Sequence, residues 1–433
     1  MNIFAWPARR TLAHVSLTAL LLFSSSSAHA DDSPHKYMGI GSCSSSNCHG
    51  NVNPVASGNV LQNEYVTWQK HDKHAHAYTV LGNEQSQTIA KHLGIKSAQS
   101  EPLCLKCHST YVPNAADRGD KFQIEDGVGC ETCHGPASAW LSTHTSREAT
   151  HQQNVEKGLN DLVGLSRRSQ LCLSCHHGNE DKAVDHRLIA AGHPRLSFEL
   201  DTFESIMPRH WEIDKDYRDR KMDYHSTGAW LNAQVSQAEQ ELAQISSKKR
   251  SMMGTFPEFT MFNCYACHHN LSEEQYKSRD YTGHLGEPTL NLPALVMLEQ
   301  VLGVLNPKSS ATLGTLRADL QKDFHEGANG KAIQSLQKIV RDPVLGQHVG
   351  DQQRKQILKR LIAYAANTPH LQYETAEQLA MGISSLVAES EHDSATLKSG
   401  IDGIYDALKN EKTFVADGFT AAAKKLSSQA SAL

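Results

Sequence analysis

The chain lacks several features that would place it in common protein classes. None of its 10 cysteines is isolated, because all of them occur in close pairs along the 433 residues. After the N-terminal segment there is no apolar run long enough to cross a bilayer, so we expect no transmembrane segment in the mature chain. Basic residues are not in excess, since the net charge is -5 at pH 7, and nucleic acid is therefore not an expected partner. The short basic run Lys248-Lys249-Arg250 is expected to be ordinary solvated surface.

The first residues have the pattern of a secretory signal peptide. Arg9 and Arg10 form a basic start, residues 15–23 are mostly apolar, and Ala28-His29-Ala30 provides the small residues that precede a cleavage site. We expect cleavage after Ala30, which makes residues 1–30 the signal peptide. The mature protein is expected to be exported, most simply to a periplasm.

Every cysteine pair is followed directly by histidine. The five motifs are Cys43/Cys48-His49, Cys104/Cys107-His108, Cys130/Cys133-His134, Cys172/Cys175-His176 and Cys264/Cys267-His268. Four have the form C-x-x-C-H, and the first has four residues between its cysteines.

Three kinds of site use paired cysteines. Exported proteins form disulfides, and repeated C-x-x-C pairs bind zinc in ribbon folds. Neither requires a histidine after every second cysteine. Haem c does, because two thiols bond to the porphyrin and the following imidazole reaches the iron as the proximal ligand. The sequence therefore predicts five haem c groups with their iron, the first held by a spacer that must bulge.

An iron that only transfers electrons needs a sixth ligand, and the chain has 25 histidines. Three segments are good sources: "WQKHDKHAHAY" with His71, His74 and His76 around a helical turn, "CHGPASAWLSTH" with His144, and "AAGHPRLSFELDTF" with His193 in an apolar context where an unpaired imidazole is costly. Four other histidines are more simply interpreted as surface residues: His92, His151, His186 and His284. Two more, His177 and His269, directly follow proximal ligands and are poorly placed for their own haem.

The segments "GVGCETCHGP…STH", "W…DKHAHAY" and "GHPRLSFEL" resemble the cytochrome c-554 type of multihaem cytochrome. That group is related to the hydroxylamine oxidoreductase and pentahaem nitrite reductase superfamily, and the resemblance covers about residues 38–290. It implies that His74 and His144 are distal iron ligands. His193, and His210 in "PRHW", are the further candidates.

The chain is expected to be mainly α. After the signal peptide, residues 31–290 would form the pentahaem domain, with little β structure and a thin side-chain core. Residues 291–433 would form a haem-free helical bundle, because Leu397, Ile401, Ile404 and Leu408 recur at helical spacing. Helix breaks are expected at "NPKSS", "EGANG", "RDPVLG" and "NTPH". Its role could be docking, shielding or dimerisation, and the sequence is compatible with an oligomer.

Two functions compete. The first is electron transport between redox partner proteins, from a quinol-linked donor to a terminal reductase or extracellular acceptor. The second is an oxidoreductase with a five-coordinate haem that acts on nitrite, hydroxylamine or a sulfur oxyanion. The C-x-x-C-K motif usual at the catalytic haem of pentahaem nitrite reductases is absent. Which motif histidine each distal candidate opposes cannot be read from the sequence. A catalytic haem would be one without a distal histidine, and the haem of His268 or that of His49 is the candidate.

Overall fold

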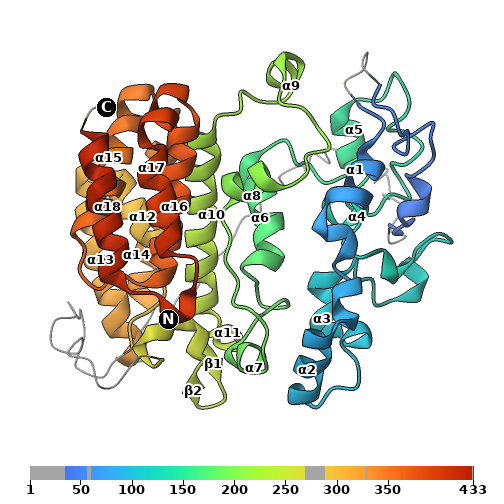
Figure 1. Ribbon diagram of the computed structural model, residues 1–433. Helices are drawn as coiled ribbons and strands as arrows, with labels where there is room; N and C mark the ends of the chain where they lie inside the picture. The colour runs from blue at the N-terminus through green and yellow to red at the C-terminus, as the bar shows by residue number, and fades with distance from the viewer. Residues whose placement is uncertain (1–34, 56–59, 269–287, 327–329, 432) are drawn as a thin grey trace, which may run out of the picture. The chain divides into compact units, whose positions relative to one another are not determined.

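The computed structural model describes residues 35–55, 60–268, 288–326, 330–431 and 433. The expected signal peptide, His269 and His284 lie outside the described residues. The described part is mainly α, as predicted, with one small antiparallel sheet (Figure 1). Residues 35–433 form one compact unit.

Short helices and loops make up the first half of this unit. They are α1 (Glu64–His71), α2 (Glu84–Leu93), α3 (Pro102–His108), α4 (Cys130–His134), α5 (His151–Glu156), α6 (Leu165–His176), α7 (His186–Ala190), α8 (Leu200–Ile206) and α9 (Lys215–Arg220). Helix α1 ends at His71. The Asp72 carboxylate accepts a hydrogen bond from the His74 backbone N–H, which starts a separate 3-10 turn over Lys73–His76.

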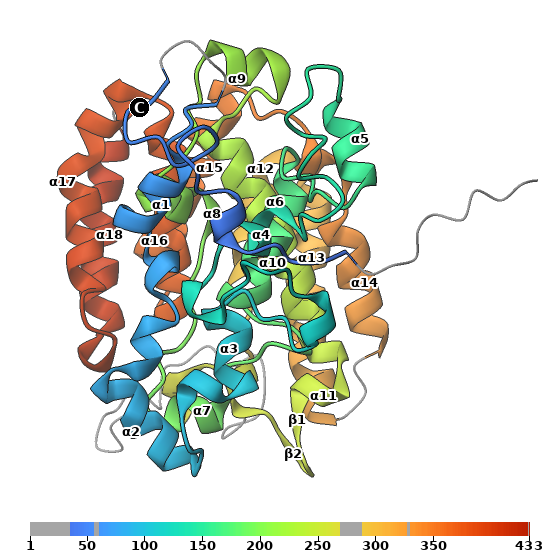
Figure 2. The same ribbon diagram turned by 90° about the vertical axis from the view of Figure 1, so that its right-hand side faces the viewer.

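Apolar packing in this half is sparse, as the sequence predicted. Its buried apolar clusters hold only a few side chains each. One of them joins α2 to α7 through Ile89, Leu188 and Ala191 (Figure 2). Side chains alone therefore give these segments little to fold around.

The long helix α10 (Ser226–Ser246) packs on both halves of the unit. It contacts α6 and α8 as well as three helices of the C-terminal bundle. Its apolar side chains recur at helical spacing: Leu231, Ala238, Leu242 and Ile245 are buried, and Val235 is partly buried. Polar side chains on other faces are buried too, so the helix is enclosed on more sides than its polar composition indicated. Then follow α11 (Lys248–Ser251) and the paired strands β1 (Met252–Met253) and β2 (Phe256–Pro257).

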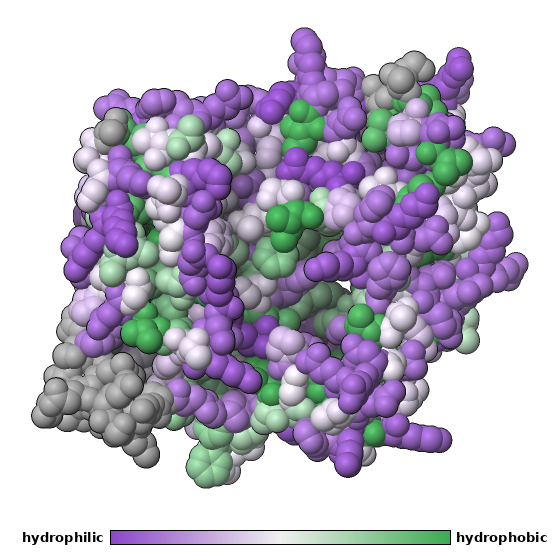
Figure 3. All heavy atoms as spheres, in the orientation of Figure 1, coloured by the Kyte–Doolittle hydropathy of each residue, from purple (hydrophilic) through white to green (hydrophobic). Residues whose placement is uncertain are grey.

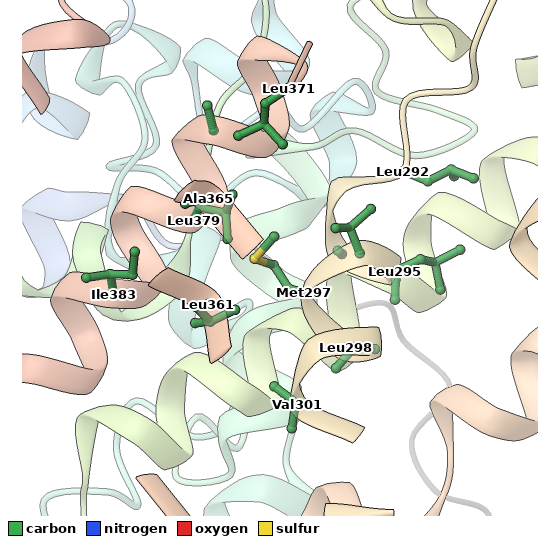
Figure 4. Close-up of a cluster of buried hydrophobic side chains, with 14 of the residues drawn as sticks. Leu292, Leu295, Met297, Leu298, Val301, Leu361, Ala365, Leu371, Leu379 and Ile383 are labelled. Atoms are coloured by element: carbon green, nitrogen blue, oxygen red, sulfur yellow. The ribbon is translucent and has the colours of Figure 1, made fainter. Parts of the chain in front are cut away.

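The C-terminal bundle has the helix breaks that the sequence predicted at "NPKSS", "RDPVLG" and "NTPH", whereas the middle of "EGANG" lies outside the described residues. Its helices are α12 (Pro293–Leu305), α13 (Pro307–Glu326), α14 (Gly330–Val340), α15 (Asp351–Asn367), α16 (Tyr373–Ala388), α17 (Glu391–Ala407) and α18 (Ala416–Ala430). Side chains from α12, α15 and α16 meet in a dense apolar core (Figure 4). This cluster includes residues on both sides of position 290, and the domain boundary there stays a prediction.

The face of the molecule in Figure 3 is largely hydrophilic, with apolar side chains in small separate groups. Among the described residues, none of the helices combines the length and the apolar character that a membrane span requires.

Glu241 on α10 should make stability depend on pH. Its Oε1 accepts a hydrogen bond from the Ala294 N–H at the start of α12. Burial raises the pKa of Glu241 from 4.5 to about 8. The folded chain therefore retains a proton that the unfolded chain releases, and the free energy of unfolding should fall as pH rises from about 4.5 to about 8.

Glu241→Gln keeps the carbonyl acceptor and removes the ionisable group, so it should flatten this fall and stabilise the protein at pH 8 by a few kcal/mol, at about 1.4 kcal/mol per pKa unit. Urea unfolding of the holoprotein at several pH values measures it. Glu239→Gln on the same helix, where Glu239 pairs with Arg341 at the surface, should retain the wild-type pH dependence. Equal slopes for wild type and Glu241→Gln would contradict the assignment.

Candidate haem centres

Three of the five motifs lie on α-helices. The motif histidines His108, His134 and His176 are the last residues of α3, α4 and α6. Residues i, i+3 and i+4 of a helix share one face, so both thiols and the imidazole of each motif can address one ligand. The last motif begins in a 3-10 turn, Cys264–Ala266. It is closed like a turn of α-helix, because the His268 N–H donates to the carbonyl of Cys264, four residues earlier, at 2.8 Å.

The stretched first motif reproduces this closure despite its longer spacer. The His49 N–H donates to the Cys43 carbonyl at 3.2 Å. The extra residues form a separate turn, in which the N–H groups of Cys48 and Gly50 both donate to the Ser45 carbonyl at 2.9 Å. The spacer therefore loops out and leaves the ends of the motif in the same relation as in a C-x-x-C-H turn.

Two of the predicted attachment cysteines differ from the other eight in their exposure. Cys48 and Cys267 are exposed, whereas the rest are partly buried. Cys48 lies in the turn of the looped-out spacer, and Cys267 follows the 3-10 turn of the last motif and is not part of an α-helix. The protein packs little against these two thiols, so their role in haem attachment rests on the motif and stays a prediction.

Each motif histidine has a second imidazole beside it from a distant part of the chain. The ring-centroid distances are 6.3 Å for His49 and His144, 6.4 Å for His108 and His193, 6.3 Å for His134 and His210, 6.0 Å for His176 and His74, and 6.2 Å for His268 and His186. All four distal candidates from the sequence are thus placed beside a motif histidine.

The common spacing is the one expected for two imidazoles on opposite sides of a metal ion. Metal–imidazole bonds are about 2 Å long and each nitrogen lies about 1 Å from its ring centre, which gives centroids about 6 Å apart. Ordinary ring packing spreads over about 4.5–7 Å. Here the spacing is uniform, whereas the interplanar angle varies from 11° to 87°. Rotation about a nitrogen–metal–nitrogen axis is free, so the residues present fit haem iron.

Hydrogen bonds fix the tautomer of half of these rings. Nδ1 faces an acceptor in His49 (Glu64 Oε2, 2.9 Å), His74 (Asp72 Oδ1, 2.9 Å), His108 (Ala77 O, 2.9 Å), His144 (Leu141 O, 2.6 Å) and His193 (Pro194 O, 2.7 Å). Carbonyl and carboxylate oxygens accept only, so Nδ1 carries the hydrogen. The Nε2 lone pair of each ring is left for a metal.

The surroundings shift the pKa values of some of these rings in opposite directions. Burial lowers the pKa of His134 and of His176 to about 4, which keeps these two imidazoles neutral and able to bind a metal. The hydrogen bond that His49 donates to Glu64 raises the pKa of His49, and the one that His74 donates to Asp72 raises that of His74. These two carboxylates would increase the electron donation of their imidazoles to a metal.

The partner of His268 is His186, a residue for which the sequence favoured a surface position. Its backbone N–H donates to Glu258 Oε1 at 2.8 Å, and its ring packs edge-on against Phe259 at 5.2 Å. Nothing in the local sequence marks this residue, because its role depends on segments about 70–80 residues further along the chain. His92 and His151 are exposed, as expected.

Thiols of different motifs lie close together. No disulfide joins any of the ten cysteines. A hydrogen bond between Cys43 and Cys130 is the largest cause that raises the pKa of the former and lowers that of the latter. The corresponding bond between Cys107 and Cys175 lowers the pKa of Cys175 to about 5. The first motif is therefore adjacent to the third, and the second to the fourth.

The turn after the third motif offers a test of the local geometry. Gly135 ends α4 with φ 83° and ψ 166°, a conformation that only glycine adopts readily, and an added Cβ would lie 2.5 Å from the Gly158 carbonyl oxygen. Gly135→Ala should lower the free energy of unfolding of the holoprotein by about 1–3 kcal/mol in urea titrations. Gly164→Ala, which meets no neighbour, should change it little. Equal effects of the two substitutions would contradict the account of this turn.

Comparison with known proteins agrees with the geometry of these sites. Residues 42–135 match the family model described as Cytochrome c554 and c-prime. No curated protein and no solved structure matched the chain. The matched segment contains the first three motifs and His74, and it supports a c-type cytochrome, with haem c and its iron as the cofactor and electron transfer as its role.

Proposed function

We propose that the chain is an exported, periplasmic electron-transfer cytochrome that holds five haem c groups, each between two histidines. The observation that carries the proposal is the set of five imidazole pairs at 6.0–6.4 Å, each with one motif histidine. When bound, haem c supplies a one-electron iron couple whose potential depends on its axial ligands, hydrogen bonds and burial.

The protein's own contribution is to attach, orient and space the five groups. The ten motif cysteines would form the thioether bonds, and the motif histidines would be the proximal ligands. His144, His193, His210, His74 and His186 would be the distal ligands of the first to fifth motifs in that order. Two histidine ligands favour a lower potential than a histidine and a methionine.

The contacts between motifs support a connected set of redox sites. The first and third motifs touch through Cys43 and Cys130, and the second and fourth through Cys107 and Cys175. Burial, followed by the nearby Cys175, raises the pKa of Cys133 to about 11, so the third and fourth motifs are also close. Four attachment points lie within one group, which is the arrangement that electron exchange between sites requires.

The same pairs argue against a catalytic haem with an open iron position. Such a site needs a motif histidine without an opposing ligand, and in the described part of the chain all five motif histidines face a second imidazole. His49 and His268, whose haems were the candidates for an open iron position, face His144 and His186. Electron transport is therefore favoured over turnover of nitrite, hydroxylamine or a sulfur oxyanion.

The partners remain defined by class. A quinol-linked donor and a terminal reductase or extracellular acceptor suit an exported carrier of low potential. The bundle at residues 291–433 is proposed to bind such a partner or a second copy of the chain. Kinship with the hydroxylamine oxidoreductase and pentahaem nitrite reductase superfamily also stays a prediction.

His186 gives the sharpest test, because the sequence offered no reason to choose it. His186→Ala should convert one haem in five from low-spin to high-spin, since its iron would lose one axial ligand, and electron paramagnetic resonance of the ferric protein detects this change. His151→Ala removes an exposed histidine that pairs with Asp161 and should leave the spectrum unchanged. A wholly low-spin His186→Ala variant with five haems would show that His186 is not a ligand.

A further inference from the structure

Arg250, the third residue of α11, is a buried cation for which the described residues provide no direct partner. The residue is only 7% exposed, although the sequence predicted a solvated position. Its Nε is buried without a hydrogen-bond partner, and its side chain forms no ion pair with any described residue. A buried charge is costly unless it is paired, so an isolated guanidinium at this depth indicates an anion that belongs beside it.

The two carboxylates that act electrostatically on Arg250 accept hydrogen bonds from other residues. Glu258 Oε1 accepts hydrogen bonds from the backbone of His186 and from Thr260, and Asp185 Oδ1 accepts one from the Leu188 backbone. Burial lowers the pKa of Arg250, and these two carboxylates only partly oppose that effect. The described part of the chain therefore supplies no direct counter-ion.

A second buried side-chain nitrogen without a partner lies in the same region. His177 follows the proximal histidine of the fourth motif, and its Nε2 is buried without a hydrogen-bond partner among the described residues. The backbone of His177 is held against α10, because Gln244 donates to the His177 carbonyl at 3.4 Å and to the Gly178 carbonyl at 3.0 Å. Helix α11, which carries Arg250, packs against the same helix. The Glu258 N–H donates at 2.8 Å to the carbonyl of Ser251, the residue after Arg250, and Glu258 Oε1 accepts from the His186 backbone N–H of the fifth pair. Arg250 is therefore near segments of both the fourth and the fifth candidate haem centres.

We propose that Arg250, with His177 as a second donor, binds a propionate of the haem at the fourth or fifth motif, an inference that rests on the proposed function. Each haem carries two propionate carboxylates, and arginine binds carboxylates in a planar, two-bond geometry. The paired propionate would satisfy the buried guanidinium. Arg250 would be a positioning residue that also sets the potential, because a nearby positive charge favours the reduced iron.

The test measures the reduction potentials of the holoprotein by spectroelectrochemical titration. Arg250→Gln should shift one reduction equilibrium about tenfold toward the ferric state, which is about 59 mV for one electron. Arg250→Lys keeps the charge and should retain most of the wild-type potential. Lys249→Gln removes an exposed charge from the adjacent position, where Lys249 pairs with Asp181, and should leave all potentials in place.

Two outcomes would overturn the proposal. One is an Arg250→Gln protein with five haems and unchanged potentials. The other is equal loss of haem from Arg250→Gln and Arg250→Lys, which would show that the position serves folding and not charge. Loss of haem from Arg250→Gln alone would support the proposal. The haem content of the wild-type protein tests the proposed function separately.

The source of the carboxylate is found by marking each haem. His186→Met should raise the potential of the fifth haem, and His74→Met that of the fourth, because a thioether ligand favours ferrous iron. Each of these two substitutions is then combined with Arg250→Gln in a double variant. The propionate belongs to the haem whose marked potential moves when Arg250 is also replaced.

Discussion

The opposition of two imidazoles at about 6 Å is the constraint on which the first half of the molecule depends. Each pair joins segments far apart in the sequence, and the intervals they enclose overlap: 49–144, 74–176, 108–193, 134–210 and 186–268. A permanent cross-link that closes a loop of roughly 100 residues stabilises a fold by about 4–5 kcal/mol in the chain-entropy model. Overlapping links of this kind would hold residues 49–268 together with little help from apolar packing.

The distribution of apolar side chains agrees with this role of the imidazole pairs in the first half of the molecule. Buried clusters around the motifs contain a few residues each, whereas the bundle has one large core that includes much of α10. Helix α10 connects the two kinds of packing. On one side Gln244 donates to the Gly178 carbonyl just beyond the fourth motif, and on another Gln234 donates to Gln378 in α16. The bundle thus supports the helix against which the motif segments fold.

Local sequence features were sufficient to recognise the five motifs and to predict the helices of the bundle. The Cys-His spacing predicts the attachment residues, and apolar periodicity with breaks such as Asn306-Pro307 located the bundle helices. The pairing of imidazoles was beyond the sequence, because it depends on how distant segments fold together. His186 illustrates this: its environment consists of Glu258, Phe259 and His268, all far along the chain. The prediction of a solvated surface position for Arg250 was wrong for the same reason, since its burial appears only in the structure.

The central claim is that five irons are each held between two histidines. The most direct measurement combines haem content per chain, by pyridine haemochrome, with electron paramagnetic resonance of the ferric protein. The account predicts five haems, all of them low-spin. Fewer than five haems, or a high-spin signal from a fully loaded wild-type protein, would contradict it.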